Sequence, residues 1–174
     1  QGRRVATVIE TFSPHFIYTF RCFDRHNNLR WEWTKRNLIP TAGRDYTLAA
    51  ALSGCSQFST GYIRLYSGAY TPQPTDTAAN YPANATEITT AYSEASRPTL
   101  VPDAPGSGLY VNAGTPAVFT FTTTTTVQGG GLHSNAVKGG TTGILISAVA
   151  APSPKVVNAG EVLRVIAGLA LTSS

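Results

Sequence analysis

Residues 117–127 read Ala-Val-Phe-Thr-Phe-Thr-Thr-Thr-Thr-Thr-Val, and a segment with five consecutive threonines is a poor candidate for a helix. A β-branched side chain loses rotamer freedom against the preceding helical turn, whereas it fits a pleated surface well. The segment therefore predicts one long strand. The three glycines that follow, at 129–131, predict either the end of this strand or a bulge in it.

Alternation of apolar and polar residues predicts further strands along the chain. The strongest case is 162–171, where Leu163, Val165, Ala167, Leu169 and Leu171 share one face. A segment at 143–150 is apolar on both faces, which predicts a central strand, and Pro152 and Pro154 are expected to end it. The remaining expected strands lie at 5–12, 16–23, 29–34 and 61–67, and 16–34 reads as a hairpin.

One short helix is expected, near 42–53. Thr41 is a suitable N-cap, Leu48, Ala51 and Leu52 form an i, i+3, i+4 apolar stripe, and Gly54 suits the end of a helix. About eight strands and one helix indicate an all-β protein. The fold class we expect is a jelly-roll-like β-sandwich with an N-terminal hairpin or arm.

The 174 residues suit one domain with an extension. Residues 1–28 are basic and aromatic and form the expected N-terminal arm or hairpin, while 29–174 form the single β-sandwich domain. Seven of the eleven prolines fall within 69–116, which predicts a long Pro-rich excursion from the sandwich. Structureless segments of this length are uncommon in compact domains and are usually functional.

Basic residues are concentrated at the start of the chain. Residues 1–44 hold eight of the thirteen Lys and Arg residues against three acidic ones. Such a segment suits an acidic protein surface or nucleic acid, or it is a solvated strand edge whose charges block unwanted pairing. Nucleic acid is not expected, because no helix-turn-helix, zinc-finger or RNP-like motif accompanies the charge.

The sequence contains no pattern typical of catalysis. His15, His26 and His133 lie far apart in the sequence and are expected to be surface or loop residues; no metal-ligand spacing, nucleophile elbow, paired carboxylates or phosphate loop is present. We therefore expect no enzyme activity, no cofactor and no metal. Cys22 and Cys55 are expected to be free thiols, and no apolar run is long enough for a membrane helix.

Five tyrosines lie between residues 62 and 92. They would suit an aromatic sugar-binding surface, anchors in a protein interface, or ordinary cross-strand packing. These residues are Tyr62, Tyr66, Tyr70, Tyr81 and Tyr92.

The order of several short motifs is familiar. Trp31-Glu32-Trp33-Thr34 leads into Asn37-Leu38-Ile39, then come Glu87-Ile88-Thr89 and Tyr92-Ser93-Glu94-Ala95-Ser96-Arg97-Pro98, and Ala159-Gly160-Glu161-Val162-Leu163 lies near the end. This arrangement, across 31–171, resembles the capsid cement (decoration) proteins of short-tailed double-stranded DNA bacteriophages. The stretch 92–98 is its most specific part.

The resemblance implies a structural virion protein that binds the outside of a phage capsid and stabilises the mature shell. Its implied partners are the major capsid protein and itself, as a homodimer or homotrimer, and its implied place is the outer capsid surface, after assembly in the host cytoplasm. The alternatives are a tail or head–tail connector component and a carbohydrate-binding receptor-recognition module. The candidate partner-interface residues are Arg3, Arg4, Arg21, Arg25, Tyr70, Tyr81, Tyr92 and Arg97.

Overall fold

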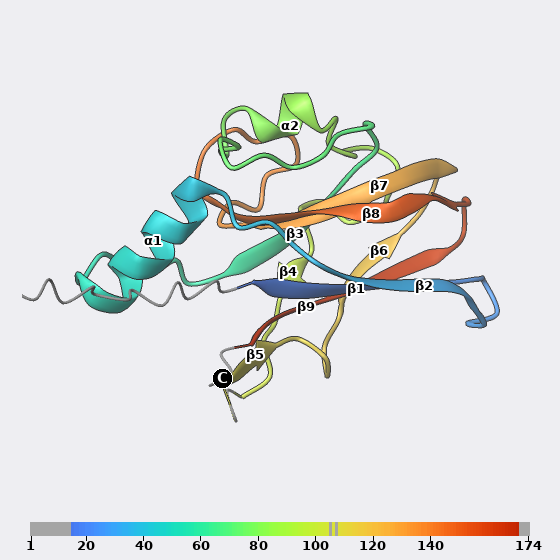
Figure 1. Ribbon diagram of the computed structural model, residues 1–174. Coiled ribbons are helices and arrows are strands. Elements are labelled where there is room, and N and C mark those ends of the chain that lie inside the picture. The colour runs from blue at the N-terminus through green and yellow to red at the C-terminus, as the bar shows by residue number, and fades with distance from the viewer. Residues whose placement is uncertain (1–14, 105, 107, 171–174) are drawn as a thin grey trace, which may run out of the picture.

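The computed structural model describes residues 15–104, 106 and 108–170. These residues form an all-β, jelly-roll-like sandwich of two antiparallel sheets, with nine strands and two short helices (Figure 1). The expected fold class is confirmed. The strand expected at 5–12 lies outside the described residues.

Five strands form the first sheet. They are β1 (Phe16–Phe23), β2 (Leu29–Arg36), β5 (Leu109–Val111), β6 (Ala117–Thr120) and β9 (Val162–Ala170). The last strand lies in the middle, because β9 pairs with β1 along its whole length on one side and with β5 and β6 on the other. The expected hairpin forms, since β1 pairs with β2.

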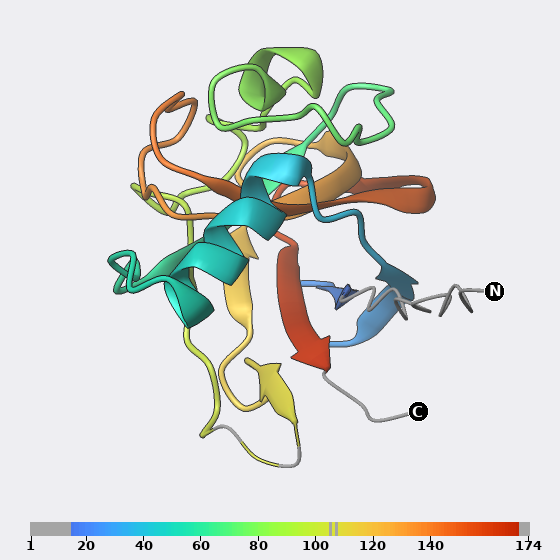
Figure 2. The same cartoon turned by 60° about the vertical axis from the view of Figure 1, so that its left-hand side comes forward.

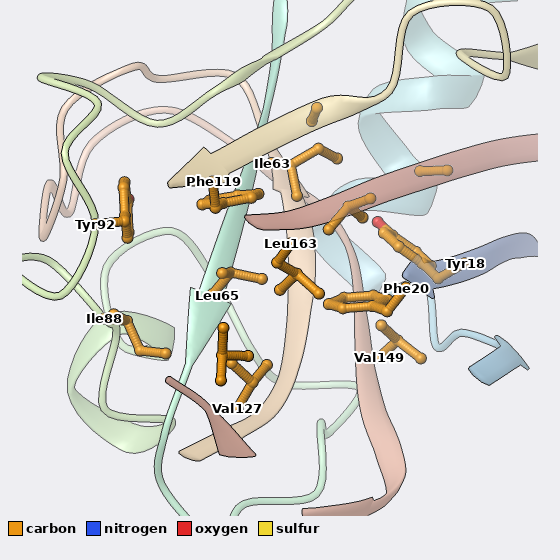
Figure 3. Packing of buried hydrophobic residues seen from close by; sticks show 14 of the residues in the cluster. Tyr18, Phe20, Ile63, Leu65, Ile88, Tyr92, Phe119, Val127, Val149 and Leu163 are labelled. Carbon is orange, nitrogen blue, oxygen red and sulfur yellow. The ribbon is translucent and has the colours of Figure 1, made fainter. Parts of the chain in front are cut away.

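Four strands form the second sheet, in the order β4-β3-β7-β8. They are β3 (Gly61–Tyr66), β4 (Thr99–Leu100), β7 (Thr125–His133) and β8 (Leu145–Val157). The core lies between the two sheets, where Figure 3 shows Phe20 of β1, Ile63 of β3 and Leu163 of β9 close together. The Trp33 ring closes one side of this core by stacking on Phe20, with the ring centroids 4.0 Å apart.

The threonine run does not form one strand, so that prediction was wrong. β6 ends at Thr120 in the five-stranded sheet, and β7 begins at Thr125 in the other sheet. The chain crosses between the sheets over 121–124, where Phe121 is buried in the core. Alternation looks the same in both sheets, so it does not reveal the point at which a strand changes sheet.

The glycine run bulges the strand and does not end it. β7 continues through all three glycines with a register shift between Val127 and Gly129. A Cβ atom on Gly129 would lie 2.1 Å from the carbonyl oxygen of Val149 and 2.4 Å from Oη of Tyr66. Glycine is therefore needed there because Tyr66 packs directly against the β7 backbone.

The prolines at 152 and 154 do not end β8, which continues to Val157. The register skips from Ala150 to Lys155 opposite Gly129 and Val127, so both prolines fall within an irregular stretch. β8 is also an edge strand and not the expected central one, which suits residues that lack an N–H group. The free edge of β8 is covered in part, because Leu38 exchanges two backbone hydrogen bonds of 2.9 Å with Ala148.

The expected helix is present as α1, Thr41–Leu52, with Pro40 and not Thr41 at the N-cap. Its expected apolar stripe faces solvent, because Leu48 and Leu52 are 58% and 80% exposed. The contact with β8 is made by the backbone at Gly43, where a Cβ atom would lie 2.3 Å from the carbonyl oxygen of Ile146. The face of α1 that packs against β8 is therefore the one that carries Gly43, where the lack of a side chain allows close approach, and not the one that carries the leucines.

The first part of the Pro-rich excursion covers the outer face of the four-stranded sheet, whereas its later part contributes β4 and β5 to the two sheets (Figures 1 and 2). It includes the short helix α2, Tyr81–Asn84, and the bridge between Tyr66 and Glu87. A second, smaller core forms under it, from Tyr66, Tyr81, Ala85, Leu145 and Ala148.

The boundary expected at residue 28 does not divide the sandwich. β1 lies between β2 and β9, so 16–28 belong to the five-stranded sheet and are not an appended hairpin. Only residues 1–14 remain for an arm, and these lie outside the described residues.

Candidate partner-binding face

The eight expected interface residues separate into three groups. Tyr81, Tyr92 and Arg97 are only 0%, 3% and 0% exposed, so the prediction that they contact a partner was wrong. Tyr70 is half-buried and donates a hydrogen bond of 2.7 Å to Oδ1 of Asp76. Arg21 and Arg25 are exposed, and Arg3 and Arg4 lie outside the described residues.

Arg97 is buried because it joins three segments of the chain. Its Nε and Nη2 atoms donate to the two carboxylate oxygens of Glu87, at 2.7 Å each. Nη1 donates to the carbonyl oxygen of Asn135 at 2.8 Å, and it lies 3.1 Å from Nδ1 of His133. The guanidinium group thus fixes the excursion to β7 and to the loop that follows it.

Arg64 extends this charged cluster on the outer face of β3. Its guanidinium carbon lies 4.3 Å from the centre of the Tyr81 ring, and Nη1 lies 3.9 Å from Oε2 of Glu87. Burial lowers the pKa of Arg64 to about 10, although the nearby Glu87 carboxylate opposes the change. One carboxylate therefore holds two arginines under the excursion, an arrangement that stabilises packing and offers no group to a partner.

His133 is buried at the same place and is not the surface or loop histidine expected from the sequence. Burial lowers its pKa to about 3, and the positive charges of Arg64 and Arg97 contribute in the same direction. The imidazole is therefore neutral at physiological pH. Its Nδ1 atom accepts a hydrogen bond of 3.0 Å from the backbone N–H of Asn135, which fixes the ring.

The tyrosines do not form a sugar-binding surface. Tyr66, Tyr81 and Tyr92 are buried, and the rings of Tyr66 and Tyr70 pack edge-on against Tyr81. Among the three interpretations of these residues, interior packing holds for this trio. An aromatic platform for a glycan would need exposed ring faces.

The two sheets differ in what covers their outer faces. The excursion covers the four-stranded sheet, whereas no segment in the described part of the chain packs over the five-stranded one (Figure 1). We call the uncovered side the open face. Its outward-pointing residues are Ile17, Thr19, Arg21, Glu32, Thr34, Arg36, Val118, Arg164 and Ile166.

Three apolar side chains point outward on the open face. Ile17 and Val118 are 37% and 40% exposed, and Ile166 is half-buried opposite Thr19. Thr19 and Thr34 join across the strands through a hydroxyl–hydroxyl hydrogen bond of 2.8 Å. A flat sheet surface of this composition can pack against another protein with little loss of hydration from charged groups.

Arginines lie beside these apolar residues. Arg21 lies in register with Arg164 on one side and with Glu32 on the other, and its guanidinium group forms an ion pair with Glu32. Arg164 lies over the Phe23 ring and donates a hydrogen bond of 3.0 Å to Asn27. With Arg36, the open face carries three guanidinium groups against one carboxylate, which favours an acidic partner.

Arg25 lies beside the open face, in the turn between β1 and β2. A Cβ atom on Gly160 would be 3.9 Å from its Nη2 atom, so the turn at 158–161 is adjacent to it. Sequence reasoning found Arg21 and Arg25 but missed Arg164, which follows them by about 140 residues. The available signal was its outward position in the alternating strand at 162–171.

Neither helix in the described part of the chain has the length and apolar character to cross a membrane. Among the same residues, no three His, Cys, Asp or Glu side chains come together as a possible metal site. Comparison of the chain with protein-family models, curated proteins and solved structures found no match. The resemblance to cement proteins therefore depends on the sequence motifs alone.

Proposed function

We propose that this chain is a non-catalytic structural virion protein that cements a phage capsid, binding the shell through the open face. The partner is the acidic outer surface of the major capsid protein, and the bound protein stabilises the mature shell. A cement protein needs a rigid body and a surface complementary to its neighbours. The sandwich and the open face meet these two requirements.

The observation that carries the proposal is the unequal covering of the two sheets. Ile17, Val118 and Ile166 leave apolar surface on an outer sheet face that no described segment covers, and apolar surface rimmed by polar side chains is typical of an interaction site. The flanking arginines supply orientation and salt-dependent attraction, while the apolar side chains supply contact that does not depend on salt.

The head–tail connector is the second candidate, because it would use the same face on a different partner. The carbohydrate-binding module is disfavoured by the burial of Tyr66, Tyr81 and Tyr92. Location in the particle separates the first two candidates. Many copies spread over the shell support the cement function, and copies at a single vertex support the connector.

The test measures binding of purified variants to capsid shells stripped of this protein. Arg164→Glu and Ile166→Lys alter the open face at outward positions, so both should keep the melting temperature and lose most of the binding. The matched control is Arg44→Glu, which makes the same charge change on α1. Unchanged binding of both open-face variants would overturn the proposal.

A further inference from the structure

One edge of the five-stranded sheet is formed by β2. This strand pairs with β1 on one side, and no segment among the described residues hydrogen-bonds to the backbone on its other side. The free edge is eight residues long, Leu29–Arg36. A free strand edge presents unpaired N–H and C=O groups, so it can pair with a strand of another chain.

The edges at β5, β6 and β8 differ from β2 because other segments partly close them. The N–H of Asp103 donates a hydrogen bond of 2.7 Å to the carbonyl oxygen of Val111 in β5. The N–H of Ser93 donates one of 2.9 Å to the carbonyl oxygen of Thr120 in β6, and Leu38 bonds to β8. The edge of β2 is therefore the one along which a further strand can be added.

The pairing of β2 with β1 shows which backbone groups point to this edge. The N–H of Asn37 donates a hydrogen bond of 3.0 Å to the carbonyl oxygen of Phe16, so these two residues occupy a hydrogen-bonded position of the antiparallel ladder. Such positions alternate with positions whose N–H and C=O groups point away from the neighbouring strand. Glu32, Thr34 and Arg36 therefore direct their backbone groups to the free edge, whereas the residues between them bond to β1.

The charges on β2 are self-complementary. Charged side chains on an edge strand usually prevent pairing with other strands. When a second β2 runs antiparallel to the first with the two Thr34 residues opposite each other, Glu32 of each copy lies opposite Arg36 of the other. Opposite charges at directly paired positions stabilise a sheet, and these side chains all lie on the open face.

Neighbouring registers lack this match. Moving the second strand by two residues in one direction places Lys35 opposite Lys35, and moving it by two in the other direction places Arg30 opposite Arg36. Like charges directly opposite each other destabilise a sheet. A move by one residue breaks the hydrogen bonding, because the outward-directed backbone groups no longer meet. The sequence of β2 therefore favours one register.

From these observations we infer that two copies of this chain associate through their β2 edges, as an antiparallel pair centred on Thr34. Each paired position at this edge exchanges two backbone hydrogen bonds. The Glu32 carboxylate then lies between Arg21 of its own chain and Arg36 of the second copy. The two five-stranded sheets become one continuous sheet with both open faces on the same side. The inference does not depend on the proposed virion function, because it concerns the free protein.

The first test is sedimentation equilibrium of the full chain from about 1 to about 200 µM, which spans the dissociation constants of modest interfaces. The unaltered protein should form dimers and no larger species, because two identical edges that pair leave no further site. Thr34→Pro removes an N–H that points to the free edge and keeps the bonds to β1, so it should stay monomeric. Arg44→Glu on α1 is the control and should dimerise like the unaltered protein.

A charge exchange tests the register. Arg36→Glu sets carboxylates opposite each other, and Glu32→Arg sets guanidinium groups opposite each other, so each variant alone should associate at least about tenfold more weakly. An equimolar mixture should form a heterodimer, because every carboxylate then faces a guanidinium group again. Restored association also shows that both variants fold. A mixture that associates no better than its components overturns the inference.

Amide hydrogen exchange identifies the surface that pairs. The amides of Glu32, Thr34 and Arg36 should exchange more slowly at high than at low protein concentration, whereas those of residues 31, 33 and 35 should not change. A protein that stays monomeric at about 200 µM overturns the inference. A dimer without added protection at these three amides, or one that persists in the Thr34→Pro variant, also overturns it, because association then uses another surface.

Discussion

Arg97 and Glu87 form a two-point ion pair inside the protein, with Nε–Oε1 and Nη2–Oε2 distances of 2.7 Å each. Their side chains are 0% and 3% exposed. The pair joins two parts of the Pro-rich excursion, the bridge to Tyr66 at Glu87 and the segment before β4, and Arg64 lies close to the same carboxylate. A bidentate contact of this kind is directional, so it fixes how the excursion lies on the sheet.

Removing one partner of this pair should destabilise the fold strongly. Arg97→Met leaves the Glu87 carboxylate buried beside a single, more distant arginine, and we expect the free energy of unfolding to fall by about 3–5 kcal/mol. Urea denaturation measures the change. Arg21→Met removes the exposed ion pair with Glu32 and should cost less than about 1 kcal/mol. Similar losses for both variants would contradict the prediction.

The buried His133 makes stability depend on pH. Its pKa is lowered to about 3 in the folded protein, whereas the unfolded chain titrates near 6.5. The unfolded state thus binds more protons between these values, so stability is complete above pH 6.5 and falls on acidification. The expected contribution to the slope is about 1.4 kcal/mol per pH unit between pH 6 and 4.5.

His133→Gln should remove this part of the slope. Urea titrations of both proteins at several pH values between 4.5 and 7.5 measure it, above the range in which most carboxylates titrate. The variant will be less stable at pH 7 because Arg97 loses a neighbour, so the comparison concerns slopes and not absolute values. Parallel curves for the two proteins would show that the histidine is accessible to protons in the folded state.

Gly129 should not tolerate a methyl group. A Cβ atom there meets the carbonyl oxygen of Val149 and the Tyr66 hydroxyl, so either Tyr66 or the β7–β8 pairing must move. Gly129→Ala should lower the free energy of unfolding by about 1–3 kcal/mol. Gly106→Ala is the control, because a Cβ atom at that residue meets nothing within 4 Å. A neutral Gly129→Ala variant would mean that Tyr66 does not need to lie against the strand.

The two cysteines should differ in reactivity. Burial raises the pKa of the Cys22 thiol to about 12, with a further rise from the Glu161 carboxylate, while Cys55 is only half-buried. Iodoacetamide at pH 8 should therefore modify Cys55 alone in the folded protein, and both residues in urea. Peptide mass spectrometry assigns the sites. Modification of Cys22 under native conditions would reveal opening of the β1 end of the core.

Sequence periodicity predicted the strands whose two faces differ. In β1 and β9 one face meets the core and the other meets solvent, so alternation reports both the strand and its orientation. The alternation pattern did not predict features that depend on which distant segment a strand pairs with. The threonine run changes sheet at 121–124, and the prolines of β8 are tolerated because they fall in a bulge on an edge strand. Both outcomes depend on the strands with which these segments pair, and the sequence of a single segment does not identify its pairing partner.

The candidate interface was predicted only in part for a similar reason. Arg21 and Arg25 are exposed, but Tyr81 and Arg97 are buried because the excursion folds back on the four-stranded sheet, and Tyr92 is buried in the main core against Phe119. Composition identifies aromatic and charged residues as possible anchors without showing which layer covers them. Arg97 became a core residue because Glu87 and His133 lie beside it, and that proximity appears only in three dimensions.

The central place of β9 governs the timing of folding during synthesis. β9 pairs Leu169 with Phe16 at one end and Val162 with Phe23 at the other, and it also holds β5 and β6. The ribosome must therefore release residue 170 before the five-stranded sheet can close around its middle strand. Until then the β1–β2 hairpin has an unpaired strand edge along β1, and unpaired edges promote association with other nascent chains. Chaperones that bind extended apolar segments should bind the nascent chain during this interval. Slow synthesis of β9 should lower the yield of soluble protein.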